Sequence, residues 1–280
     1  MANSNLRTLG PLEAKVVLSL REHSREVVDV SDIRTLAGPG SATRNVVQQL
    51  IRKGWLSRVR RGRYILLPPE HGPDNLGENN VLALATAAVT PSYAGWWSAA
   101  SFHGFTTQIP LTAFIAVTRK LPDRELEGSV VRFVHLSNPR FFGAQLYPVY
   151  GRQVPISSPV KTLIDCLDRP ALVGGVAEVV RVSDRALASV PGNEAVETAI
   201  RFGSKSVMQR LGAISDLVDR PLPDPARQRL RAAIPKSARS RFGRGRPLEG
   251  DLGYVAAWGL FIDARREELL PEVPRAKSRK

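Results

Sequence analysis

The chain has 280 residues, of which 43% are hydrophobic, and this is enough for one large or two smaller folded domains with a sizeable core. Lys and Arg outnumber Asp and Glu by 40 to 26, a net charge of +14, which favours polyanionic partners, nucleic acid before an anionic membrane. The single cysteine, Cys166, excludes an intrachain disulfide and a zinc site built from several thiolates. Because the first residues lack the apolar core of a signal peptide and no stretch reaches ~18 apolar residues, we expect a cytoplasmic protein with no membrane partner.

The positive charge is concentrated at the two ends of the chain. Residues 1–69 carry 12 Lys and Arg against 5 Asp and Glu (net +7), residues 70–226 carry 14 against 15 (net −1), and residues 227–280 carry 14 against 6 (net +8). Pro and Gly between residues 68 and 77 break helix and strand periodicity and predict a linker. We therefore expect an N-terminal domain over residues 1–69 and a larger domain over residues 78–280, with the role of the basic segment 227–280 left open.

The N-terminal domain begins with a predicted helix at residues 11–24, which follows a proline and has apolar residues at helical spacing. Residues 27–30 are β-branched and predict a short strand. Residues 31–38 and 41–54 each begin with a serine suited to a helix N-cap and end at a glycine. These two segments predict a second and a third helix, joined by a turn at the Pro-Gly pair between them.

The third predicted helix has two faces of different chemistry. Its apolar residues fall on one stripe that suits burial. The other face carries residue types whose side chains can form bidentate hydrogen bonds with base edges, Arg with guanine and Asn or Gln with adenine. These residues are Arg44, Asn45, Gln48, Gln49 and Arg52. A face that is merely solvated usually contains more Glu and Lys, so we expect this helix to read bases.

A predicted hairpin follows, because two short apolar strands at residues 55–59 and 63–68 flank a turn with a glycine. The hairpin carries Arg58, Arg60, Arg61 and Arg63. Such clustering of like charge is costly unless anions face it, and each phosphate contact releases condensed counterions. Helices followed by a basic hairpin predict a winged helix-turn-helix that binds double-stranded DNA over residues 1–69.

The second domain is predicted to contain both helices and strands. Residues 78–90 and 93–105 read as helices, the latter with Trp96, Trp97 and Phe102, which we interpret as core. Four strands are predicted at residues 111–119, 129–136, 146–151 and 152–157, and helices fill most of residues 158–218. The fold class is therefore α+β, an N-terminal winged helix-turn-helix followed by a larger mixed α+β domain.

Catalytic chemistry has little support in the sequence. His23, His71, His103 and His135 are scattered without a metal-binding spacing, and no phosphate-binding glycine loop or nucleophile motif occurs. His103 could act as a base, but a structural histidine is the simpler interpretation. Asp165 and Asp168 could hold a metal in a nuclease or pair with nearby Lys161 and Arg169. We expect no enzyme, no metal and no cofactor.

Three segments resemble the AbiEi family of antitoxins from bacterial abortive-infection (type IV) toxin–antitoxin systems. They are "LIRKGWLSRVRRGRYILLP" in the first domain, and "YAGWWSAASFHGF" and "VPISSPVKTLIDCLDRPALVGGVAEV" in the second. The resemblance covers roughly residues 10–220. It implies a DNA-binding domain that represses its own promoter at inverted repeats, and a second domain that counteracts a nucleotidyltransferase toxin. It also implies that DNA binding would involve Ser41, Thr43, Arg44, Gln48 and the hairpin arginines.

The leading hypothesis is therefore a nucleoid-associated antitoxin and autorepressor whose partners are promoter DNA and a cognate toxin. In this hypothesis the basic segment 236–246 extends the surface that contacts phosphates. The alternative is a winged-helix transcription regulator that responds to a small molecule bound near Trp96 and Trp97 and has no toxin partner.

Overall fold

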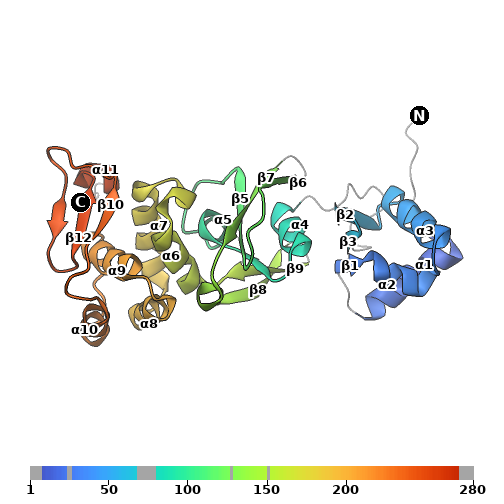
Figure 1. Ribbon diagram of the computed structural model, residues 1–280, viewed down its shortest axis with the longest axis horizontal. Coiled ribbons are helices and arrows are strands. Elements are labelled where there is room, and N and C mark those ends of the chain that lie inside the picture. Colours follow the sequence, from blue (N-terminus) through green and yellow to red (C-terminus); the bar gives the residue numbers. More distant parts are fainter. Residues whose placement is uncertain (1–7, 24–26, 68–79, 127–128, 150–151, 271–280) are drawn as a thin grey trace, which may run out of the picture.

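The computed structural model describes residues 8–23, 27–67, 80–126, 129–149 and 152–270. It is a mixed α+β protein with three regions in succession along its long axis (Figure 1). We call them the N-terminal region (residues 8–67), the central region (residues 80–217) and the C-terminal region (residues 224–270). The predicted linker at residues 68–77, with His71, lies outside the described residues, so the predicted domain boundary stays a prediction.

The N-terminal region contains three helices and a small sheet with the strand order β1-β3-β2. Its elements are α1 Pro11–Glu22, β1 Val27–Asp29, α2 Val30–Ala37, α3 Ser41–Arg52, β2 Leu56–Arg60 and β3 Arg63–Leu66. Each helix and strand predicted here is confirmed. The predicted serine N-caps of the second and third helices are wrong, because the N-cap residue of α2 is Asp29 and that of α3 is Gly40. All three helices bury apolar side chains against one face of the sheet, including Val16, Ile33 and Leu50, and Tyr64 of β3 lies in the same cluster.

The central region is built on a six-stranded mixed sheet with the order β6-β7-β5-β4-β9-β8. The pairs β5–β7 and β4–β9 are parallel, and the other neighbours are antiparallel. The strands are β4 Ser92–Ala94, β5 Thr112–Val117, β6 Arg124–Leu126, β7 Ser129–His135, β8 Ala144–Val149 and β9 Arg152–Ser157. All four predicted strands are confirmed, apart from residues 150–151, which lie outside the described residues.

Both faces of this sheet are covered. Alternate residues of β5 point to opposite faces, as the two-residue period of a strand requires. Ala113, Ile115 and Val117 pack with α4 (Val81–Ala88), while Phe114 and Ala116 pack with the helices on the other side. The remaining helices of the region are α5 Trp96–Phe102, α6 Pro159–Asp168, α7 Val176–Ser189, α8 Gly192–Phe202 and α9 Lys205–Leu217, with short 3-10 turns at Asn138–Arg140 and Pro170–Val173.

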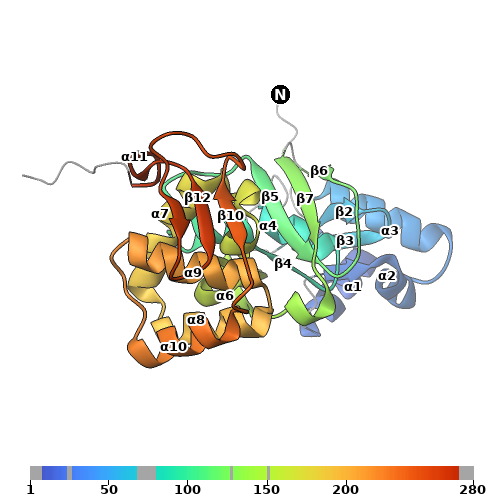
Figure 2. The ribbon, with the colours of Figure 1, turned by 60° about the vertical axis from the view of Figure 1, so that its left-hand side comes forward.

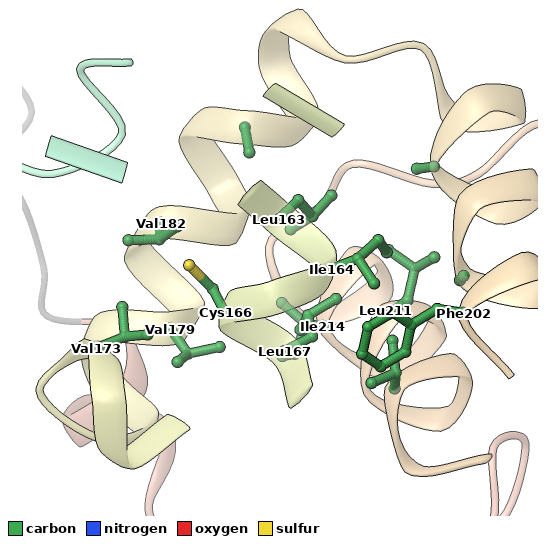
Figure 3. Close-up of a cluster of buried hydrophobic side chains, with 14 of the residues drawn as sticks. Leu163, Ile164, Cys166, Leu167, Val173, Val179, Val182, Phe202, Leu211 and Ile214 are labelled. Carbon is green, nitrogen blue, oxygen red and sulfur yellow. The ribbon is translucent and has the colours of Figure 1, made fainter. Parts of the chain in front are cut away.

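Helix α6 lies at the centre of the helical layer. Figure 3 shows Leu163, Cys166 and Leu167 of this helix among apolar side chains of α7, α8 and α9. Burial raises the pKa of the Cys166 thiol well above its ordinary value, so this side chain stays protonated and packs as a small apolar group. In the described part of the chain, no helix is long and apolar enough to cross a membrane.

Two of the predictions for the central region are wrong in part. The segment predicted as a helix at 93–105 begins as strand β4, which pairs with β5 and β9, and the helix starts only at Trp96. The segment between the strands at 111–119 and 129–136 contains strand β6 in place of a simple connection. Strands of three residues show no hydrophobic period, and they form here because a neighbouring strand supplies their hydrogen bonds.

The C-terminal region, whose role the sequence leaves open, is folded. It contains α10 Asp224–Ala233, β10 Ser240–Gly243, β11 Gly253–Val255, β12 Leu260–Asp263 and α11 Arg266–Leu269, and the strands form a sheet with the order β10-β12-β11. Figure 2 shows β10 and β12 over α9, and their inward side chains join the core. Arg241 pairs with Asp263, and Arg244 pairs with Asp251 and Glu268.

Candidate nucleic-acid interface

Helix α3 has one buried face and one exposed face, as its sequence predicts. Val46, Val47 and Leu50 lie in the core of the N-terminal region, and Arg44 and Gln48 are exposed on the other side. The packing of three apolar side chains on α1, α2 and the sheet fixes the rotation of the helix. The amide and guanidinium groups are therefore held facing outward.

The turn before α3 requires two glycines. Gly38 and Gly40 have φ values of +89° and +72°, which L-residues with a side chain rarely adopt. Thr43 is buried, and its hydroxyl donates a hydrogen bond to the Gly38 carbonyl. Thr43 also lines the groove between α3 and the hairpin, so its predicted contact with DNA stays a prediction, while its hydroxyl stabilises the turn between α2 and α3.

A groove of about 710 Å³ lies between α3 and the hairpin. Gln48 lines it together with one arginine from α2, one from α3 and two from the hairpin. These arginines are Arg34, Arg44, Arg58 and Arg61. Arg34 is not among the predicted DNA-binding residues, which lie only on the third helix and the hairpin. Its position on the exposed side of α2, one helical turn from the α2–α3 turn, was the available signal.

The four groove arginines are not neutralised within the protein. Among the described residues, none of their guanidinium groups forms an ion pair or a hydrogen bond. Other arginines of the chain do have such partners, for example Arg132 with Asp123 and Arg220 with Asp184. Four like charges around one concave surface repel one another, and an anion between them relieves that repulsion. The groove is therefore suited to a phosphate backbone.

The other two hairpin arginines face away from the groove. A β-bulge between Arg58 and Arg60 shifts the register of β2, so the alternation of side chains is reversed beyond it. Arg60 donates from Nε to the Ala88 carbonyl at 3.2 Å, and Arg63 donates from Nη2 to the Thr90 hydroxyl at 3.0 Å. Of the four predicted hairpin arginines, Arg58 and Arg61 therefore line the groove and Arg60 and Arg63 lie outside it, and DNA binding by these residues stays a prediction.

The remaining predicted residues of α3 lie beside the groove and do not line it. Ser41, Asn45 and Arg52 are exposed, and Gln49 is half-buried. The Arg52 guanidinium donates to the Gln49 side-chain oxygen. These four residues form an outer stripe of the helix that is open to a ligand wider than the groove.

The base of the hairpin is attached to the central region. The buried Arg152 of β9, in the central region, donates to the Leu66 carbonyl at 2.7 Å. Within the N-terminal region, Arg21 of α1 donates to the Leu67 carbonyl at 2.8 Å. Val59, Ile65 and Leu67 pack in one apolar cluster with α4 and the central sheet. The hairpin therefore has one face toward the groove and one face buried against the central region.

The two aspartates considered as catalytic candidates have structural partners. The Asp165 carboxylate binds the Lys161 ammonium, and Tyr93 donates to it at 3.3 Å. Asp168 lies 3.4 Å from Arg169. Among the described residues, no group of three or more His, Cys, Asp or Glu could hold a metal ion. These contacts favour the ion-pair alternative for both aspartates.

His103 contacts the Ser157 carbonyl through Nε2 at 2.7 Å, which supports the structural interpretation. Burial lowers its pKa from the ordinary 6.5, so the unfolded chain binds a proton first as the pH falls. The contribution of His103 to stability is therefore present above pH 6.5 and decreases below it.

We expect His103→Gln, which keeps a donor, to flatten the loss of unfolding free energy between pH ~7.5 and ~5 in urea titrations. Equal slopes for both proteins would contradict this.

Comparisons with known proteins identify the fold and no family. No family model matches the chain, and no curated protein is similar to it. A crystal structure of the RV2827C protein from Mycobacterium tuberculosis is similar, with a TM-score of 0.61 and 20% sequence identity, covering 94% of this chain and 95% of that one. At this identity the similarity concerns the fold alone.

Proposed function

We propose that the chain is a transcriptional repressor that binds double-stranded DNA through a winged helix-turn-helix in the N-terminal region. The observation that carries the proposal is the groove, which is lined by an exposed glutamine of α3 and by four arginines that form no ion pair with the described residues. The order of three helices and a hairpin, with β1 paired to β3, supports the same assignment. In such domains the third helix enters the major groove and the hairpin contacts the backbone.

The positions of the side chains suggest a division of roles. Arg44 and Gln48 lie on successive turns of α3, where both can reach base edges in a major groove. Arg34, Arg58 and Arg61 lie on the walls of the groove and would contact phosphates on either side of the helix. Asn45 and Arg52 on the outer stripe extend the contact along the DNA.

We further propose that the DNA is the promoter of its own operon and that the central region counteracts a nucleotidyltransferase toxin. The support for this part is the resemblance of three segments to AbiEi antitoxins. The test is growth of cells that express the neighbouring toxin gene with or without this chain. Rescue of growth supports the antitoxin role, and equal growth arrest in both cultures contradicts it.

Base reading by α3 predicts that Gln48→Ala and Arg44→Ala relax sequence discrimination. Each lost bidentate contact costs ~1–3 kcal/mol against the correct base and little against other sequences. The measurement is fluorescence anisotropy with the upstream region of the operon and with a scrambled duplex. We expect the ratio of the two dissociation constants to fall by a factor of roughly 5 to 150 for each substitution.

The neighbouring Gln49→Ala is the matched control, since Gln49 lies outside the groove and binds Arg52. It should keep most of the discrimination. If Gln48→Ala and Arg44→Ala both discriminate as well as the unchanged protein, α3 is not the reading helix.

A ligand-responsive regulator is the second candidate, and a different observation favours it. Trp96 is fully buried, as expected for core, but Phe102 is half-exposed and borders an apolar hollow of about 620 Å³ with Ile109, Leu111 and Val130. A small apolar molecule bound there would be the effector, so the site near Trp96 and Trp97 is replaced by this one. Operator affinity that changes with such a molecule, and not with a toxin, would select this candidate.

A further inference from the structure

The small C-terminal sheet has two faces of different chemistry. Phe242 and Ile262 point inward and belong to the core. The intervening residues of the same strands lie on the outer face, and the strand register places Arg241, Phe261 and Tyr254 side by side in one row across the sheet. This row is far from the groove of the N-terminal region, because β10–β12 and α3 lie at opposite ends of the molecule (Figure 1).

The row contains two adjacent aromatic rings with a guanidinium group at each end. The centroids of the Tyr254 and Phe261 rings are 4.7 Å apart, with 36° between the ring planes. The Arg241 guanidinium lies 4.9 Å from the Phe261 centroid, and the Arg239 guanidinium lies 5.5 Å from that of Tyr254. Tyr254 is 42% exposed. An exposed tyrosine ring beside a second aromatic ring and two guanidinium groups is a surface on which another flat group can stack.

A small pocket of about 290 Å³ adjoins the row. Tyr254 and the cationic side chains Arg231, Lys236 and Arg239 line it, with Trp258 as the buried floor. The floor is fixed, because the Trp258 indole donates to Asp216 at 2.8 Å.

The cations of the pocket keep their charge available. Among the described residues, none of these three side chains forms an ion pair, whereas Arg241 in the row is paired with Asp263 at 2.8 Å. Arg239 donates only to backbone carbonyls, those of Lys236 and Ala238. The pocket therefore offers three positive charges beside an exposed aromatic ring.

We propose that this outer face binds single-stranded nucleic acid, with one unpaired base in the pocket against Tyr254 and the flanking phosphates on Arg231, Lys236 and Arg239. Stacking on a side chain needs a free base face, which an unpaired nucleotide has and a duplex does not. The described residues 227–270 carry 10 Lys and Arg against 5 Asp and Glu, a net charge of +5, which attracts a polyanion to this end of the molecule. The surface is separate from the proposed operator site and does not depend on it.

The test uses the full chain and labelled 12-nucleotide strands, dT12 and U12, in fluorescence anisotropy titrations at two salt concentrations. Tyr254→Ala should weaken strand binding by roughly 5- to 150-fold, the usual range for a lost base stack, and Tyr254→Phe should retain it. Lys236→Gln should reduce the salt slope by ~0.7, the value for one phosphate contact of a single strand. The ratio of dT12 to U12 affinity tells whether DNA or RNA is preferred.

Three controls separate this site from general attraction to a basic protein. Phe102→Ala removes an exposed aromatic ring elsewhere and should leave strand binding unchanged. Arg58→Ala with Arg61→Ala alters the proposed operator groove and should also leave it unchanged. The proposal is overturned if Tyr254→Ala binds both strands as the unchanged protein does, if only the groove variant loses binding, or if polyglutamate competes as well as dT12.

Discussion

Replacing Asp165 with asparagine is expected to lower the free energy of unfolding by about 3–5 kcal/mol, because it leaves a buried cation without its counter-charge. Lys161 and Asp165 are both 0% exposed and lie one turn apart on α6. The Lys161 ammonium also donates to the Tyr93 hydroxyl at 2.9 Å and lies 5.1 Å from the Phe202 ring centroid. Burial raises the pKa of Tyr93, so its phenol stays protonated and donates to Asp165.

Urea unfolding measures this loss of unfolding free energy, and two further variants show whether the unpaired charge causes it. Asp123→Asn breaks the exposed pair with Arg132 and should cost at most ~1 kcal/mol. The double variant Lys161→Met with Asp165→Leu removes both charges and should be more stable than Asp165→Asn, since no unpaired charge remains. A double variant as unstable as the single one would show that packing, and not charge, explains the loss.

Removing the two groove-facing arginines of the hairpin, Arg58→Ala with Arg61→Ala, is expected to weaken DNA binding by roughly sixtyfold at ~0.1 M salt. Each lost phosphate contact reduces the slope of log K against log salt by ~0.9, which corresponds to about eightfold at this concentration. The slope should therefore fall by ~1.8 for the pair. Anisotropy titrations of an operator duplex over a range of salt concentrations give both quantities.

The matched control removes the same charge from the same hairpin. Arg60→Ala with Arg63→Ala deletes the two side chains that bind Ala88 and Thr90. We expect the salt slope to stay within experimental error of the unchanged protein, while the urea midpoint falls because the hairpin loses its attachment. If both double variants reduce the slope equally, charge alone and not its orientation determines binding.

The N-terminal region could be predicted almost completely from the sequence. Its helices have apolar residues at a regular helical spacing, and a glycine follows α2 and α3 at or near their ends. These signals are local in the sequence and do not depend on tertiary contacts. The orientation of Arg60 could not be predicted, because the bulge that turns it depends on pairing between β2 and β3. Arg63 could have been placed, since it alternates with Tyr64, which the core requires to point toward α3.

The strands of the C-terminal region could not be predicted from the sequence, for a different reason. These strands have only three or four residues, too few to show a hydrophobic period, and the connections between them are rich in glycine and arginine. They are held by contacts with distant parts of the chain. Gly212 of α9 is the clearest case, because an added Cβ would lie 2.4 Å from the Trp258 ring. No window of sequence around residues 240–263 contains that information.

The hairpin is attached to the C-terminal end of α4. Arg60 and Arg63 donate hydrogen bonds to residues at the end of α4. The orientation of the hairpin therefore depends on the position of the last turn of that helix. A small displacement there would open or narrow the groove without any change in the side chains that line it. If the groove binds DNA as proposed, the last turn of α4 is the part of the central region through which a second ligand would alter that affinity.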